Sequence, residues 1–219
     1  MKRWMVWGGV LLLISLLFGC SSKKRAEETL PAMPQEALAR QMLEKKYGEP
    51  FSVDSVEKTP ANRAFGPAVY TAAAHSEALA GTFTARWEEG SSAVADDYAR
   101  LFWENSIQDR VRSALRPYAE TAQWTVVYEL SRQTWRSTDE LDRYLKESET
   151  YVDLELTVSG DAAQAAGTVN AVRHALLEAQ LQYAMSCSWN GASVVLSEKN
   201  GLAPLTDEDV RQKLERSAG

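Results

Sequence analysis

The second half of the chain alternates apolar and polar residues at a period of two. Between residues 151 and 158, valine and leucine alternate with acidic, aromatic or hydroxyl-bearing residues, and residues 124–130 repeat the pattern. Such alternation predicts strands with one buried and one solvent-exposed face. A third run, residues 183–189, is separated from residues 192–196 by Asn190-Gly191, which predicts a hairpin with a two-residue turn.

The first half predicts one helix followed by shorter strands. The apolar residues of 35–47 lie on one helical stripe that ends at Gly48. Three short strand patterns follow at 51–56, 68–73 and 82–87, and segments rich in glycine, proline or serine separate them.

Two helices are expected in the middle of the chain. The longer one starts near Asp96, whose carboxylate suits an N-cap, and ends at Pro117. Its apolar residues fall on two faces, so it either bends near residues 105–106 or is covered on two sides. Ser137 and Glu140 have the spacing of a capping box for a second, short helix.

Two more helices complete the pattern and set the fold class. Residues 161–182 place apolar side chains on one narrow stripe, and residues 206–217 place acids at the start and bases at the end. The sequence therefore predicts an α+β fold, with an antiparallel or mixed sheet and about four to five helices packed mainly on one face. We expect residues 35–219 to form this domain, with a division into 35–120 and 121–219 as the alternative.

The first twenty residues carry a different pattern. Lys2 and Arg3 precede an apolar run that ends in Leu17-Phe18-Gly19-Cys20. This segment resembles the signal peptide of bacterial lipoproteins with its lipobox. The resemblance implies cleavage before Cys20, diacylglycerol on the Cys20 thiol and, often, an acyl chain on the new amino terminus. An uncleaved transmembrane anchor is the alternative, although the apolar run is shorter than the roughly 20 residues that a span needs.

The same resemblance implies how the chain is organised. Residues 1–19 are expected to be the signal peptide, and residues 20–34 the lipidated cysteine with a flexible tether, which leaves 35–219 as the domain. The lipid on Cys20 is expected to anchor the protein in the bilayer, on the extracytoplasmic face of the cell membrane. The domain is similar to small uncharacterised lipoproteins of Gram-positive bacteria, for which no activity carries over.

The charge of the chain narrows the choice of partner. Removal of residues 1–19 takes away Lys2 and Arg3 and no acid, so the formal charge changes from −6 to −8. Nucleic acid is not an expected partner, because binding to it depends mainly on phosphate contacts by lysine and arginine. A hydrophobic fraction of 45% is enough for a core without disulfides.

The sequence predicts no metal site and no cofactor. Cys187 is the cysteine that remains once Cys20 is lipidated, and its place in residues 183–189 puts it on the inward face of a strand. We interpret it as a buried, inert thiol, with a nucleophile or redox sensor as the alternative. His174 lies opposite the apolar stripe of its helix and is expected in solvent, and His75 is expected in a loop. The two histidines are not expected to converge on Cys187.

Three residues are candidates for an interaction surface. Asp153 and Glu155 point to the same solvent-exposed face of a predicted strand, where they can meet a cation or a basic partner. Trp135 lies in a polar segment between two arginines, a setting that binding hot spots favour. The alternative for Trp135 is a ring that folds back onto the core.

No catalytic residues are predicted. The sequence contains no G-x-S-x-G, P-loop, H-E-x-x-H or C-x-x-C motif. It favours a non-enzymatic binding module of the cell envelope, whose partner is an envelope protein or a wall polymer. A small envelope hydrolase or thiol enzyme is the first alternative. A solute-binding lipoprotein is the second, and it is disfavoured because two ligand-clamping lobes usually need a longer chain.

Overall fold

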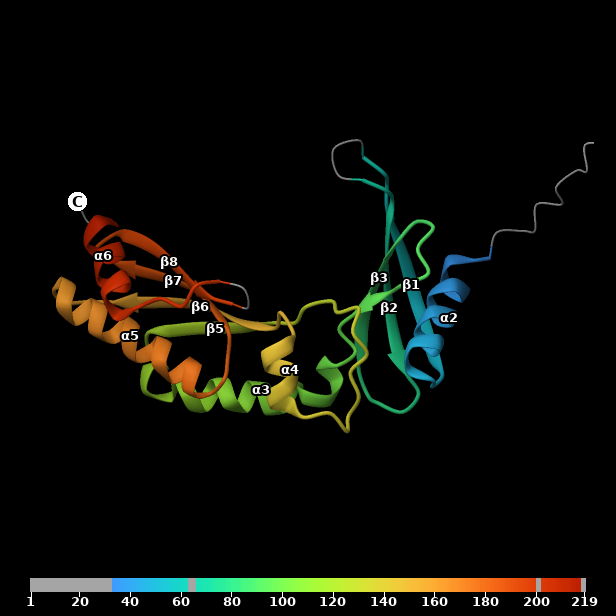
Figure 1. The fold of residues 1–219 in the computed structure, drawn as a ribbon, viewed down its shortest axis with the longest axis horizontal. Coiled ribbons are helices and arrows are strands. Elements are labelled where there is room, and N and C mark those ends of the chain that lie inside the picture. Colours follow the sequence, from blue (N-terminus) through green and yellow to red (C-terminus); the bar gives the residue numbers. More distant parts are fainter. Residues whose placement is uncertain (1–32, 63–65, 200–201, 218–219) are drawn as a thin grey trace, which may run out of the picture. The chain divides into compact units, whose positions relative to one another are not determined.

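Five α-helices and two four-stranded sheets make up the part of the chain that the structure, a computed structural model, describes (Figure 1). The described residues are 33–62, 66–199 and 202–217. This composition confirms the predicted α+β class. The predicted signal peptide, Cys20 and the tether up to residue 32 lie outside the described residues.

The elements divide into two groups along the chain. Those of the first half are α2 (Gln35–Tyr47), β1 (Phe51–Thr59), β2 (Val69–Ser76), β3 (Thr82–Glu88), β4 (Ala95–Asp96), α3 (Arg100–Leu115) and the 3-10 helix η1 (Arg116–Tyr118). Those of the second half are β5 (Ala122–Val127), α4 (Leu141–Glu147), β6 (Tyr151–Val158), α5 (Ala162–Glu178), β7 (Tyr183–Trp189), β8 (Ala192–Glu198) and α6 (Asp207–Ser217). The chain from Pro34 onward forms one compact unit. In the described ranges, no helix has both the length and the apolar character needed to cross a bilayer.

The first sheet is an antiparallel meander in the order β1-β2-β3-β4. The helix before it, α2, has the predicted bounds and ends where Gly48 takes a left-handed conformation with φ of 77°. The Gly48 backbone N–H donates to the Glu44 carbonyl at 2.8 Å, which satisfies one of the last carbonyls of the helix. β1 is longer than the predicted 51–56 because it continues as a largely exposed arm, which an apolar pattern cannot mark.

The second sheet is mixed, in the order β5-β6-β7-β8. β6 and β7 are parallel, and α5 provides the crossover that a parallel pair needs, whereas the other two pairs are antiparallel. The predicted alternation in β6 and the predicted hairpin between β7 and β8 are confirmed. Asn190 and Gly191 both have positive φ, 51° and 83°, as a tight hairpin turn requires.

Helices cover one face of the second sheet. α3, α5 and α6 share a hydrophobic core with the inward-facing residues of β5 to β8, and Figure 1 shows α3 and α5 on the same side of the strands. From α5 this core takes the predicted stripe: Ala165, Val169, Val172 and Leu176. The outward-facing residues of the four strands stay exposed or half-buried. For this sheet, the prediction of helices on one face is confirmed.

α3 is covered on two sides, which is one of the two predicted arrangements. The hydrophobic clusters against the first and second sheets are called the first and the second core. Four residues at a helical spacing face the second core: Trp103, Ile107, Val111 and Leu115. Leu101 packs against the first core, and Phe102 against both cores. α3 therefore joins the core of the first sheet to that of the second.

The prediction that Asp96 caps α3 is wrong. α3 begins at Arg100, and Asp96 is buried in β4. The Lys46 ammonium donates to Asp96 Oδ2 at 2.8 Å and to the Ser131 carbonyl at 2.8 Å, and the Tyr47 hydroxyl donates to Asp96 Oδ1 at 2.6 Å. Burial raises the pKa of Asp96, although Lys46 acts in the opposite direction. The carboxylate thus ties β4 to α2 instead of starting a helix, and Lys46 links both to Ser131 after β5.

The predicted capping box of Ser137 and Glu140 is also wrong. Glu140 occupies the N-cap position of α4 and its side chain makes no capping hydrogen bond. One residue earlier, the Asp139 carboxylate accepts the backbone N–H of Arg136 at 2.7 Å. The turn before α4 is therefore closed by a different carboxylate.

Candidate functional site

The uncovered face of the second sheet, hereafter the open face, carries both predicted interaction carboxylates. Asp153 and Glu155 are exposed and point the same way from β6. Asp153 is paired with Thr125 of β5, and Glu155 is paired with Gln123 of β5 and Ser186 of β7. Because β6 is an inner strand, both carboxylates lie in the interior of the face and not at its edge.

Small polar side chains form most of the remaining open face. They are Thr157 of β6, Ser186 and Ser188 of β7, and Ser193 and Ser197 of β8. Val195 of β8 lies among them and is 69% exposed. At one end of the face, the Lys199 ammonium lies 3.1 Å from the centroid of the Tyr151 ring. Carboxylates and hydroxyls in this arrangement accept hydrogen bonds from cationic groups.

Trp135 is not part of an exposed surface. Its side chain is 1% exposed and packs against the rings of Trp103 and Tyr144, with centroid separations of 6.3 and 5.3 Å. The Arg143 guanidinium lies over the same ring at 5.4 Å. The hot-spot interpretation of Trp135 is therefore wrong, and the alternative of a ring folded onto the core describes it.

Cys187 is a buried thiol in the second core. It lies on the inward face of β7, as predicted, and has no disulfide partner. Burial raises the pKa of its thiol to about 11. A thiol in this setting is mostly protonated at neutral pH, whereas a nucleophilic cysteine needs an accessible thiolate.

We expect Cys187 to react with a thiol reagent at pH 8 at least about 100-fold more slowly than an exposed cysteine, because reaction requires local opening and ionisation. The measurement is disulfide-exchange labelling of the chain from residue 20 carrying Cys20→Ala. The matched control adds Cys187→Ala and Ser188→Cys, which places a thiol on the exposed side of the same strand. Equal rates in the two proteins would contradict the buried position and favour a thiol enzyme.

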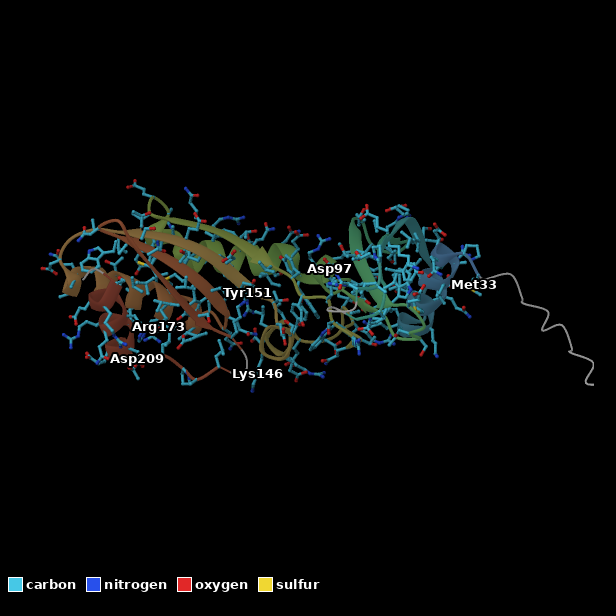
Figure 2. All side chains as sticks on the ribbon, turned by 90° about the horizontal axis from the view of Figure 1, so that it is seen from above. Met33, Asp97, Lys146, Tyr151, Arg173 and Asp209 are labelled. Carbon is cyan, nitrogen blue, oxygen red and sulfur yellow. The ribbon has the colours of Figure 1, made fainter. Side chains whose placement is uncertain are left out.

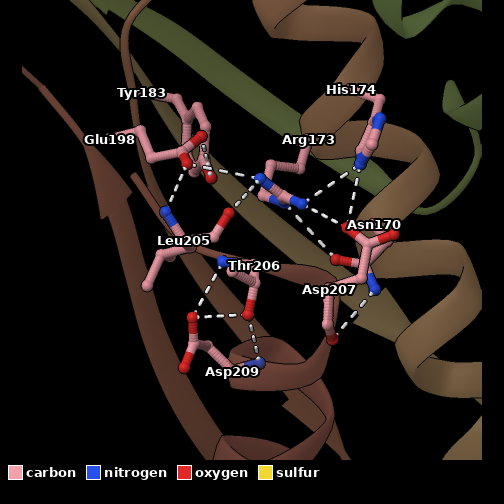
Figure 3. A network of polar contacts seen from close by, with 9 residues as sticks. All are labelled: Asn170, Arg173, His174, Tyr183, Glu198, Leu205, Thr206, Asp207 and Asp209. Atoms are coloured by element: carbon pink, nitrogen blue, oxygen red, sulfur yellow. Dashed lines mark hydrogen bonds and ion pairs between the residues drawn. The ribbon is translucent and has the colours of Figure 1, made fainter. Parts of the chain in front are cut away.

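Arg173 lies at the centre of a polar network between α5, β8 and the start of α6 (Figure 3). Its guanidinium donates to the Leu205 carbonyl at 2.9 Å, to Glu198 Oε1 at 3.3 Å and to Asn170 Oδ1 at 3.3 Å, and it also bonds the Asp207 carboxylate. The side chains of Arg173 and Glu198 are only 5% and 9% exposed. Each therefore neutralises the other inside the protein, and the network fixes α6 to the sheet.

The two histidines lie on different elements. His174 Nε2 is 2.9 Å from Asp207 Oδ1 on the exposed side of the Arg173 network, so this imidazole is in solvent, as predicted, but paired. The hydrogen bond with His174 is the main reason that the pKa of Asp207 is lowered. The prediction of a loop for His75 is wrong, since it lies in β2, 3.2 Å from Asp54 Oδ1. Within the described residues, no three histidine, cysteine or acidic side chains are placed to hold a metal ion.

An apolar cleft of about 420 Å³, hereafter the leucine cleft, opens beside α4 and the end of α5. Its apolar walls are Leu145, Leu177, Leu181, Leu202 and Pro204, and its polar lining is Lys146, Gln180, Gln182, Glu198 and Lys199. Sequence reasoning missed this cleft because its lining comes from separate segments of the chain. The only local signal is the pair Leu177 and Leu202, each outside the predicted core stripes.

No protein-family model matches the chain, and no curated protein matches it. Among solved structures, the chain is similar to one described as a DUF5037 family protein from Ruminococcus gnavus ATCC 29149. The two share 12% sequence identity at a TM-score of 0.32, over 71% of this chain and 75% of that chain. At this TM-score the likeness supports no conclusion about function.

Proposed function

We propose that the chain is a lipid-anchored binding protein of the bacterial cell envelope, whose open face binds a basic segment of another envelope protein. The anchor is diacylglycerol on Cys20, which holds the domain at the extracytoplasmic face of the membrane. Binding of this kind needs no chemical step, so the proposal does not include catalysis.

The observation that carries the proposal is the position of Asp153 and Glu155. Both are exposed in the interior of a sheet face that no described helix covers. They are two residues apart on one strand, which separates them by about 6.6 Å along it. Alternate side chains of an extended peptide have the same spacing, so two lysines or arginines at that interval can meet both carboxylates at once.

The remaining side chains of the open face suit the same partner. Serine and threonine hydroxyls surround the two carboxylates and can accept further hydrogen bonds from a cationic side chain. A protein segment is favoured over a neutral wall polymer because the carboxylates provide charge complementarity for the former alone.

We expect the double variant D153N/E155Q to bind a basic peptide about twofold to thirtyfold more weakly, since two exposed ion pairs contribute about 0.2 to 1 kcal/mol each. The probe is a fluorescent peptide of alternating lysine and serine, titrated with the chain from residue 20 carrying Cys20→Ala. Added salt is expected to weaken binding to the unmodified face and to have less effect on the variant.

The matched control is E36Q/E178Q, which removes the same charge at two exposed positions, one on α2 and one on α5. This control should bind the peptide within about twofold of the parent chain, because distant exposed charges are screened. Equal losses in both variants would show attraction to net charge only, and no loss in D153N/E155Q would refute the open face as the binding surface. The proposal of a basic partner would also be refuted if D153N/E155Q bound a neutral glycan more weakly than the parent chain but bound the peptide equally well.

A further inference from the structure

We propose that the leucine cleft binds a small amphiphilic anion, specifically a straight-chain carboxylate of the fatty-acid type. Its alkyl chain would lie against the leucines and its carboxylate at the lysines of the rim. Lys199 lies where the cleft borders the open face, but this inference does not depend on the function proposed above.

Exposed apolar side chains concentrate at the leucine cleft. Leu177 is 42% exposed and Leu202 is 55% exposed, and they are two of the four large hydrophobic side chains that are exposed in the described part of the chain. Both line the cleft, together with the buried Leu145 and Leu181. Apolar surface left in contact with water and gathered in one concave place is typical of a ligand site, and the cleft volume lies in the range of small-molecule sites.

The two lysines in the lining of the cleft favour an anionic ligand over a cationic one. Lys146 of α4 and Lys199 after β8 both line the cleft, and the Lys199 ammonium lies over the ring of Tyr151 (Figure 2 labels Lys146 and Tyr151). The one acidic residue of the lining is Glu198, and its carboxylate is engaged by Arg173 at 3.3 Å and by the Tyr183 hydroxyl at 3.0 Å. Because that buried carboxylate is already paired with Arg173, the charged groups of the lining that suit a carboxylate ligand are the two lysines.

Hydrogen bonds hold the walls of the cleft in place. Gln182 Nε2 donates to the Leu145 carbonyl at 2.9 Å and to the Ser148 carbonyl at 2.8 Å, which fixes the end of α4 to the start of β7. Gln180 takes a left-handed conformation with φ of 59°, and its N–H donates to the Leu177 carbonyl at 2.9 Å. The side chains of Leu145 and Leu177 are therefore presented by a hydrogen-bonded backbone, so the ligand does not have to order that part of the site.

The test is calorimetric titration of the chain from residue 20, carrying Cys20→Ala, with laurate and with dodecyltrimethylammonium, both below their micelle concentrations. The described cores lie between Ala39 and Leu214, so this chain retains them. It is kept free of detergent, which would compete for the cleft. We expect laurate to bind at least about tenfold more tightly than the cationic amphiphile, because the two share an alkyl chain and differ in charge.

Two variants separate the apolar and the charged contributions. L177S/L202S is expected to weaken laurate binding at least about tenfold, since both leucines lose apolar contact with the chain. K199Q is expected to reduce the preference for laurate over the cation about threefold or more. The matched controls V195S and K213Q alter an exposed valine and an exposed lysine outside the cleft lining and should bind laurate as the parent does.

Several results would overturn this inference. They are the absence of laurate binding, equal affinity for the two amphiphiles, and a loss of binding in V195S as large as that in L177S/L202S. Thermal unfolding checks that L177S/L202S is folded. D153N/E155Q should bind laurate normally and L177S/L202S should bind the lysine–serine peptide normally, so failure of one proposal leaves the other standing.

Discussion

Replacing Arg173 with leucine is expected to lower the free energy of unfolding by about 3 to 5 kcal/mol, because the change leaves a buried charge without its partner. Glu198 would keep its hydrogen bonds from the Tyr183 hydroxyl and from the Leu205 N–H, at 3.0 and 2.7 Å. It would lose the guanidinium that neutralises it, and α6 would lose its bond through Asp207. Urea unfolding followed by tryptophan fluorescence measures the change.

Two further variants show whether the loss comes from the buried pair. Arg211 forms ion pairs with Glu208 and Glu215 on the exposed side of α6, so R211L should cost no more than about 1 kcal/mol. R173L/E198Q should recover part of the loss of R173L, because the stranded charge is removed as well. A cost for R173L no larger than that for R211L would show that the Arg173 network does not fix α6 to the sheet.

The second large effect concerns the anchor. The triple variant L17A/G19A/C20A is expected to move from the membrane fraction to the soluble extracytoplasmic fraction. The changes remove the thiol that takes the lipid and create an Ala-x-Ala pattern for ordinary signal-peptide cleavage at the same place. Two acyl chains contribute about 0.8 kcal/mol per buried methylene, so their loss should release nearly all of the protein.

The control for this experiment is G19A alone, which keeps Cys20 behind a small residue and should stay in the membrane fraction. Cell fractionation and blotting of wild type, control and triple variant make the comparison. Wild-type protein in the soluble fraction would contradict the anchor, and so would a cleaved triple variant that remains in the membrane.

Local signals in the sequence predicted most of the elements. The bounds of α2 follow from an apolar stripe and from Gly48, whose left-handed conformation ends the helix. The alternation in β6 and the Asn190-Gly191 turn likewise depend on neighbours in sequence, and the structure has both. At the start of α5, Asp161 and Gln164 form a capping box whose spacing is visible in the sequence.

Errors arose where distant residues decide the outcome. Asp96 looks like a helix cap among its neighbours, but Lys46 and Tyr47, from the preceding helix, bind its carboxylate in the interior. Trp135 lies between two arginines along the chain, but Trp103 and Tyr144 bury its ring. A period in the sequence reports the faces of one element and contains no information on which other element covers them.

Of the two candidate sites, one could be predicted from the sequence and the other could not. Asp153 and Glu155 could be placed on an exposed face from alternation alone, because that prediction concerns a single strand. The leucine cleft could not be predicted, since Leu177 lies in α5 and Leu202 lies after β8, and only the folded chain places both in the lining of one cleft. Exposed leucines in separate segments of the chain indicate a binding site only when the fold places them side by side.

The most direct test of the anchored binding protein is the intact mass of the wild-type chain extracted from bacterial membranes. We expect a polypeptide that begins at Cys20 and is heavier than residues 20–219 by a diacylglyceryl group, with a further acyl chain where the amino terminus is acylated. A chain that begins at Cys20 without lipid, or one that still begins at Met1, would contradict the account.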